Sequence, residues 1–106
     1  MIVSVLTRKS RISEQAVWAA ALEIAMPRIL GVLEAQPGFV SVEYLWGVNE
    51  PGLAAQITRW QSEGDCSRYV MQGGAAMVAT IEEAAIPTAP YPDGAWVRNT
   101  FASTDA

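Results

Sequence analysis

Histidine is absent from this chain of 106 residues, and cysteine occurs once, at Cys66. Without an imidazole there is no histidine general base, no Ser-His or Cys-His pair, and no histidine-ligated zinc or haem iron. A lone cysteine forms no internal disulfide and no thiolate cluster, which fits a reducing, cytoplasmic setting. A metal held by carboxylates alone stays open, but the eleven acidic residues are spread out. Only Glu82 and Glu83 are adjacent, and neighbours on a helix diverge by about 100°, so we expect no metal and no cofactor.

Charge is scarce as well. Charged residues make up 17% of the chain, the net charge is −4, and the seven basic residues, with Lys9 as the single lysine, are scattered. Nucleic-acid binding needs a clustered basic surface, which this pattern does not provide. No run of apolar residues approaches the ~20 that a membrane-spanning helix needs. The apolar run at the N-terminus is also too short for a signal peptide. We expect a cytoplasmic protein with neither nucleic acid nor membrane as a partner.

Apolar residues, in contrast, make up 51% of the chain. The length suits a single domain spanning residues 1–106. A domain of this size buries only roughly 60–70% of the surface that its unfolded chain exposes. A small, apolar, lightly charged domain has too little polar side chain to cover itself, which favours an oligomer that hides the excess.

Apolar periodicity and turn formers divide the chain into alternating strands and helices. Strands are predicted at residues 2–7, 39–46, 53–60 and 95–101, and helices at about 14–35, 63–71 and 75–86. Ser13 and Ser62 are the expected N-caps, and Pro27 predicts a kink or a brief break in the first helix. The first helix is expected to begin its apolar stripe with Val17, Ala20, Ala21 and Ile24. The last helix is expected to have an apolar side made of Met77, Val78, Ile81 and Ala85. The order β-α-β-β-α-β predicts an α+β, ferredoxin-like domain with a four-stranded antiparallel sheet.

The predicted strands are apolar on both sides. In the segment 39–46, alternation places Val40, Val42, Tyr44 and Trp46 on one side and Phe39, Ser41, Glu43 and Leu45 on the other. Two helices cover only one face of such a sheet, so the other face needs a second cover. We expect a homodimer in which two copies pack sheet to sheet.

Three segments carry a family resemblance: QPGFVSVE after the first helix, ITRWQSEGD at the end of the third strand, and WVRNTF in the last strand. In this order the chain resembles the antibiotic biosynthesis monooxygenase domain of the dimeric α/β-barrel superfamily. The resemblance implies a dimeric α/β barrel and cofactor-free oxygenation of a polyketide-like phenol in a cleft between sheet and helices. Haem-degrading relatives use an axial histidine, so the missing histidine sets this chain apart from that branch.

The resemblance implies a pocket lined by Asn, Trp, Arg, Tyr and sometimes His side chains, and the chain offers all of these residue types except histidine. We take Trp60, Tyr69 and Arg59 as candidate catalytic residues, with the Trp60 indole N–H directed at a substrate oxygen. Candidate substrate-binding residues are Trp46, Tyr44, Arg98 and Asn99. Each also has a structural interpretation: the tryptophans can pack in the core, and a strand arginine can pair with Glu43.

Two functions therefore stay open. The first is a cofactor-independent monooxygenase acting on an aromatic or polyphenolic small molecule. The alternative is a non-catalytic dimeric α/β barrel that binds a small molecule or serves a structural role. A third possibility is an assembly module like the ligand-sensing domains of some regulators.

Overall fold

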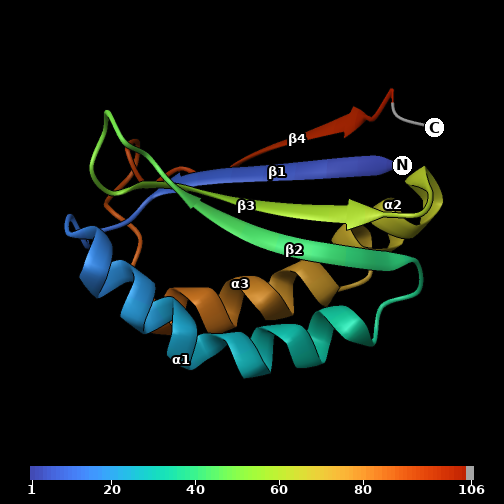
Figure 1. Cartoon of the computed structure of the whole chain (residues 1–106), viewed down its shortest axis with the longest axis horizontal. Coiled ribbons are helices and arrows are strands. Elements are labelled where there is room, and N and C mark those ends of the chain that lie inside the picture. The colour runs from blue at the N-terminus through green and yellow to red at the C-terminus, as the bar shows by residue number, and fades with distance from the viewer. Residues whose placement is uncertain (105–106) are drawn as a thin grey trace.

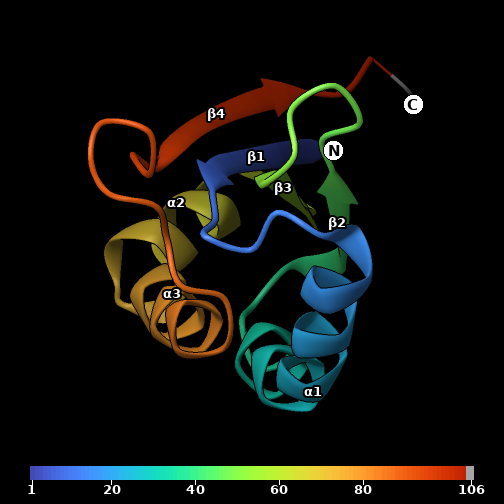
Figure 2. The same cartoon turned by 90° about the vertical axis from the view of Figure 1, so that its left-hand side faces the viewer.

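The computed structural model describes residues 1–104 and contains a four-stranded antiparallel sheet covered on one face by three helices. Figure 1 shows the helices below the sheet, and Figure 2 shows the same two layers from one end. The elements are β1 (Ile2–Lys9), α1 (Gln15–Glu34), β2 (Phe39–Trp46), β3 (Leu53–Trp60), α2 (Glu63–Met71), α3 (Gly74–Ala85) and β4 (Val97–Ala102). The predicted ferredoxin-like α+β fold is confirmed.

The strands lie in the order β2-β3-β1-β4, so β1 and β3 form the centre of the sheet. β1 is longer than predicted and continues to Lys9, whereas β4 begins at Val97 rather than at residue 95. The second helical region consists of two helices, as expected from the Gly73-Gly74 pair. Gly73 has a φ of 96°, in the left-handed region that favours glycine.

The first half of helix α1 differs from the prediction in which side it buries, whereas Ile29 and Leu33 in its second half are buried as their apolar spacing predicts. Trp18, Ala25, Ile29 and Leu33 are buried, while Val17 and Ile24 from the predicted stripe are 51% and 82% exposed. Both stripes are apolar, so periodicity could not choose between them. The large Trp18 ring takes the inner side, where it lies 5.2 Å from the Trp46 ring.

The ends and the middle of α1 need two further corrections. Its N-cap is Glu14, which makes no side-chain capping hydrogen bond, so the prediction for Ser13 is wrong. The helix also runs through Pro27 without a break. At α2, by contrast, Ser62 is the N-cap as predicted, and its hydroxyl accepts a hydrogen bond from the Asp65 backbone N–H at 3.1 Å.

Helix α1 is also the one helix in the described part of the chain that is long and apolar enough to cross a membrane, with a mean hydropathy of 1.6. This contradicts the expectation that no such stretch exists. Core helices of soluble proteins meet the same criterion, and α1 packs its Trp18, Ile29 and Leu33 side chains into the interior.

A bulge in β2 changes which residues face the helices. The pairing register with β3 shifts between Phe39 and Ser41, so that Phe39 lies opposite Trp60 and packs against its ring at 5.6 Å. Val40 is 42% exposed. The prediction that Phe39 and Val40 follow the simple alternation is therefore wrong, whereas Tyr44 and Trp46 do share the inner side.

Candidate functional site

The inner face of the sheet buries several polar side chains among its apolar ones. On the inner face, toward the helices, the buried strand residues include Ser4, Arg8, Gln56 and Thr58. On the outer face, no element of residues 1–104 covers the sheet (Figure 1). The outward positions are largely apolar: Val3, Val5, Leu45, Ile57, Val97 and Phe101. Buried polar groups are costly unless they are paired, so the inner face indicates a site.

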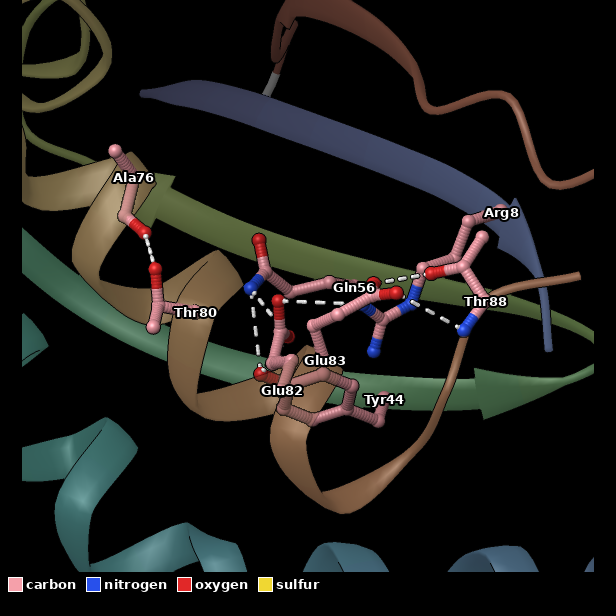
Figure 3. A network of polar contacts seen from close by, with 8 residues as sticks. All are labelled: Arg8, Tyr44, Gln56, Ala76, Thr80, Glu82, Glu83 and Thr88. Carbon is pink, nitrogen blue, oxygen red and sulfur yellow. Dashed lines mark hydrogen bonds and ion pairs between the residues drawn. The ribbon is translucent and has the colours of Figure 1, made fainter. Parts of the chain in front are cut away.

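Glu82 is the centre of the polar interior (Figure 3). It comes from α3 and its side chain is 1% exposed. Its Oε2 accepts hydrogen bonds from the Tyr44 hydroxyl at 2.5 Å and from Gln56 Nε2 at 2.9 Å. Gln56 Nε2 also lies 3.2 Å from the Tyr44 hydroxyl oxygen. The burial of Tyr44, with the charge and hydrogen bond of Glu82, holds the pKa of Tyr44 far above its usual value.

The other oxygen of Glu82 faces Arg8. Glu82 Oε1 and Arg8 Nη1 are 3.8 Å apart, which is an ion pair but too long for a hydrogen bond, and neither atom has a hydrogen-bond partner. The Arg8 guanidinium also lies over the Trp96 ring, 4.4 Å from its centroid. A cavity of about 10 Å³ adjoins the cluster and is bordered by Trp18, which is room for a single oxygen-sized group.

A second group of polar side chains lies between α2 and β4. Arg98 Nη1 donates to Ser4 Oγ at 2.7 Å, and the guanidinium is 6.0 Å from the centroid of the Tyr69 ring. Burial raises the pKa of Tyr69, and the positive charge of Arg98 opposes that shift. The buried Tyr69 hydroxyl has no hydrogen-bond partner. Burial likewise raises the pKa of the Cys66 thiol, again opposed by Arg98.

Two hollows open along the β4 side of α2 and α3. One, of about 250 Å³, is lined by Arg98, Thr100, Cys66 and Met71 among others. The other, of about 400 Å³, lies beside Trp96 and reaches α3 at Thr80 and Glu83. β4 runs above this side of the helical layer (Figure 2), and both hollows are open to a small molecule from the surface.

Five of the seven predicted site residues lie on the inner side of the sheet: Trp60, Tyr69, Tyr44, Trp46 and Arg98. The rings of Trp60 and Tyr69 are 4.7 Å apart and both side chains are buried. The indole N–H of Trp60 donates to Thr58 Oγ1 at 2.9 Å, so in this structure it serves the core.

Arg59 and Asn99, the other two predicted site residues, do not lie on the inner side of the sheet. Consecutive strand residues point to opposite faces, so Arg59 lies on the outer face, where its Nη2 bonds Glu43 Oε1 at 2.9 Å. This is the pairing with Glu43 that the sequence suggested. Asn99 is exposed opposite Val5 of β1, also away from Trp60 and Tyr69.

Sequence analysis missed Arg8, Gln56 and Glu82 as members of the site. The predicted first strand ends at residue 7, so Arg8 lies outside it, and Glu82 is adjacent to Glu83 on a helix where neighbouring side chains diverge. The spacing of four from Val78 to Glu82, both buried, was the available signal. Met77, predicted to be buried, is 58% exposed. Among residues 1–104 no group of three His, Cys, Asp or Glu side chains could hold a metal ion.

Comparison with known proteins gives a fold but no sequence family. No family model matches the chain, and no curated protein matches it. SnoaB, described as a cofactor-independent oxygenase from Streptomyces nogalater, has a TM-score of 0.66 at 18% identity, over 99% of this chain and 94% of that one. A monooxygenase from the gene ActVA-Orf6 of Streptomyces coelicolor, in complex with Nanaomycin D, has a TM-score of 0.66 at 21% identity, over 99% and 88%.

A third structure is described as an antibiotic biosynthesis monooxygenase and has a TM-score of 0.60 at 8% identity. The match covers 99% of this chain and 100% of that one. The chain thus shares the fold of proteins named antibiotic biosynthesis monooxygenases. The resemblance inferred from the three sequence segments is confirmed at the level of fold.

Proposed function

We propose that this chain, which has the fold of antibiotic biosynthesis monooxygenases, is a cofactor-independent monooxygenase for an acidic aromatic small molecule and acts as a homodimer. The observation that carries the proposal is the polar inner face of the sheet. Arg8, Gln56, Thr58 and Glu82 are buried there although apolar side chains would stabilise a purely structural core at lower cost. Small-molecule sites combine apolar walls with a few convergent polar groups, as this interior does.

The ligand would enter along β4, where the hollows beside Arg98 and Trp96 offer about 250 Å³ and 400 Å³. The first hollow offers the apolar side chains of Val70 and Met71, and the second offers the flat ring of Trp96, which suits a flat ring system. Arg98 lines the first hollow and the Arg8 guanidinium lies against the Trp96 ring, so both supply positive charge for an anion. An aromatic molecule with an acidic O–H or C–H group is the class that this combination fits.

The proposed reaction converts an acidic ring methylene into a carbonyl. The substrate loses a proton to give an enolate, and molecular oxygen adds to the electron-rich carbon through one-electron transfer and recombination. The resulting hydroperoxide loses water, so one oxygen atom stays in the product and the other leaves as water. That water contains both hydrogens of the methylene group. The chain's task is to bind the ring, remove the proton and stabilise the anion.

The homodimer is supported by the outer face of the sheet. Leu45, Val97 and Phe101 are 47%, 50% and 54% exposed, and they lie on the same face as Val5 and Ile57 of the central strands. An uncovered apolar face of this kind marks a protein interface. A second copy of this sheet supplies a matching apolar surface, and a two-fold interface is the commonest solution for such a surface.

The test is oxygen consumption by the purified chain, treated with chelator and free of flavin, with anthrone and a panel of naphthalenediols. We expect uptake of one O₂ per product and a mass increase of the product that corresponds to a new carbonyl oxygen. ¹⁸O₂ should label the product once. No uptake above the protein-free rate across the panel would refute the proposed activity.

A second candidate, a non-catalytic binding protein, is favoured by one observation. The Trp60 N–H and the Tyr44 hydroxyl already have internal partners, so the structure does not require a ligand at either group. This candidate predicts that anthrone or a naphthalenediol binds in calorimetry with no oxygen uptake.

A further inference from the structure

We infer that Glu82 is the proton acceptor of the interior site, with Arg8 as the cation that stabilises the anion formed; this rests on the proposed function. The chain contains no histidine, so the base for an acidic substrate must come from another residue type. Among the side chains described above, Glu82 is the buried carboxylate in the interior, and three strands direct polar groups toward it (Figure 3).

The two oxygens of Glu82 differ in their surroundings. Oε2 accepts hydrogen bonds from Tyr44 and Gln56, at 2.5 and 2.9 Å, and these two bonds fix the carboxylate. Oε1 has no hydrogen-bond partner, and Glu82 and Arg8 both line the small cavity. An oriented general base is expected to have this arrangement: one oxygen is held in place by hydrogen bonds, and the other has a free lone pair that can accept a proton.

Comparison with the Arg59–Glu43 pair separates this geometry from an ordinary ion pair. On the outer face of the same sheet, Arg59 Nη2 and Glu43 Oε1 meet at 2.9 Å, as charge-assisted hydrogen bonds do. In the interior, Arg8 Nη1 and Glu82 Oε1 stay 3.8 Å apart, with a donor and an acceptor both unused. A hydroxyl or enol group satisfies both, because it donates to Glu82 and accepts from Arg8.

The groups that face Glu82 are consistent with this role. Arg8 from β1 is positive, while Tyr44 from β2 and Gln56 from β3 are neutral hydrogen-bond donors. Tyr69 from α2 lies within electrostatic reach of Glu82. From α1, the side chain that borders the adjoining cavity is the apolar Trp18. The cavity takes only an oxygen-sized group, so the ring of the substrate must lie outside it.

Trp96 determines where that ring can lie. One face of its indole is covered by the Arg8 guanidinium, and the ring also borders the surface hollow of about 400 Å³. The hollow and the cavity beside Glu82 share no lining residue, so binding of the substrate requires this half-buried indole to move aside. The substrate ring then takes a place next to Trp96, with its acidic group directed inward.

The proton-transfer step breaks the acidic O–H bond of the substrate's hydroxyl or enol form and forms an O–H bond at Glu82 Oε1. The electron pair stays on the substrate as an enolate, whose oxygen receives hydrogen bonds from Arg8. Molecular oxygen, the oxidant of the proposed reaction, adds to the carbanion centre. The protonated Glu82 returns its proton to the peroxide anion, which regenerates the carboxylate before the hydroperoxide loses water.

Proton transfer is tested without oxygen, by following the absorption band of the anthrone enolate when anthrone binds under anaerobic conditions at neutral pH. We expect the wild-type chain to bind anthrone largely as the enolate, and Glu82→Gln to bind it with at least about tenfold less enolate, which corresponds to a shift of one pKa unit in the bound molecule. Glu23→Gln, which removes an exposed charge on α1 far from the site, should give the enolate band of the wild type. Circular dichroism and thermal melting show whether each variant is folded.

A second variant keeps the test decisive if Glu82→Gln does not fold. Tyr44→Phe keeps the carboxylate and removes one of its two positioning hydrogen bonds, so the enolate band should fall about tenfold without loss of anthrone binding. Oxygen uptake and an enolate band that are both unchanged in folded Glu82→Gln or in Tyr44→Phe would overturn the role of Glu82 and leave the proposed activity standing. An enolate band and oxygen uptake that are both absent in the wild type would overturn the proposed activity and this inference together.

Discussion

Val5 offers the sharpest test of the proposed dimer. It lies on the central strand β1 with its side chain on the outer face, opposite Ile57 of β3 and Asn99 of β4. We expect Val5→Glu to prevent dimerisation, because it would place a carboxylate in the middle of the apolar face. In the protomer alone the same carboxylate reaches water, since no other element covers this face (Figure 1).

The expected magnitude follows from the symmetry. In a two-fold interface each substitution occurs twice. Burying an unpaired carboxylate costs several kcal/mol in full, and we take about 2 kcal/mol per copy because the side chain can turn toward the rim. The sum of about 4 kcal/mol corresponds to roughly a thousandfold weaker dimer. Sedimentation equilibrium across a wide range of protein concentrations measures this change directly.

Ile24→Glu is the matched control. Ile24 is 82% exposed on α1, more than any apolar residue named on the outer face of the sheet, yet it lies on the opposite side of the molecule. It should leave the dimer unchanged. A wild-type chain that is monomeric at tens of micromolar, or a dimer that Ile24→Glu disrupts and Val5→Glu does not, would refute the sheet-to-sheet arrangement.

Three further predictions concern the interior. Burial raises the pKa of Tyr44 and Tyr69, so stability should be constant below their usual pKa of about 10 and fall above it. The loss is up to about 1.4 kcal/mol per pH unit for each tyrosine, and Tyr44→Phe should reduce the slope in urea melts made at alkaline pH; an unchanged slope contradicts this. Burial also raises the pKa of Cys66, so its alkylation by iodoacetamide at pH 8 should be at least about tenfold slower in the folded chain than in urea; equal rates contradict it. Arg98→Met should weaken binding of a naphtholate anion by about 10–100-fold in calorimetry, whereas a neutral naphthalene should bind unchanged.

The strands and their order could be predicted because their signals are local. The segments at 39–46 and 53–60 have strand-like composition and turn formers between them, and the structure places β2 and β3 at those positions. The side of α1 that is buried could not be predicted in the same way. Its residues are apolar nearly all round, so the choice between Val17 and Trp18 depends on packing against Trp46, a contact between distant parts of the chain.

The candidate site was only partly predictable for a related reason. Aromatic residues such as Trp60 and Tyr69 are conspicuous in sequence, and they do lie in the interior. Glu82 is not conspicuous, because a helical glutamate is usually solvated. Its role depends on Arg8 and Gln56, which reach it from strands that lie far from it in the sequence.

The chemistry of the two faces of the sheet also bears on stability. A protomer that buries Arg8, Gln56 and Glu82 on its inner face gains less from that layer than an apolar core would give, because charges lose hydration on burial. The outer face supplies apolar area that can offset this cost only when it is covered. The covered outer face is therefore expected to supply stability that the polar interior does not: Val5→Glu should lower the melting temperature of the chain, whereas Ile24→Glu should leave it unchanged.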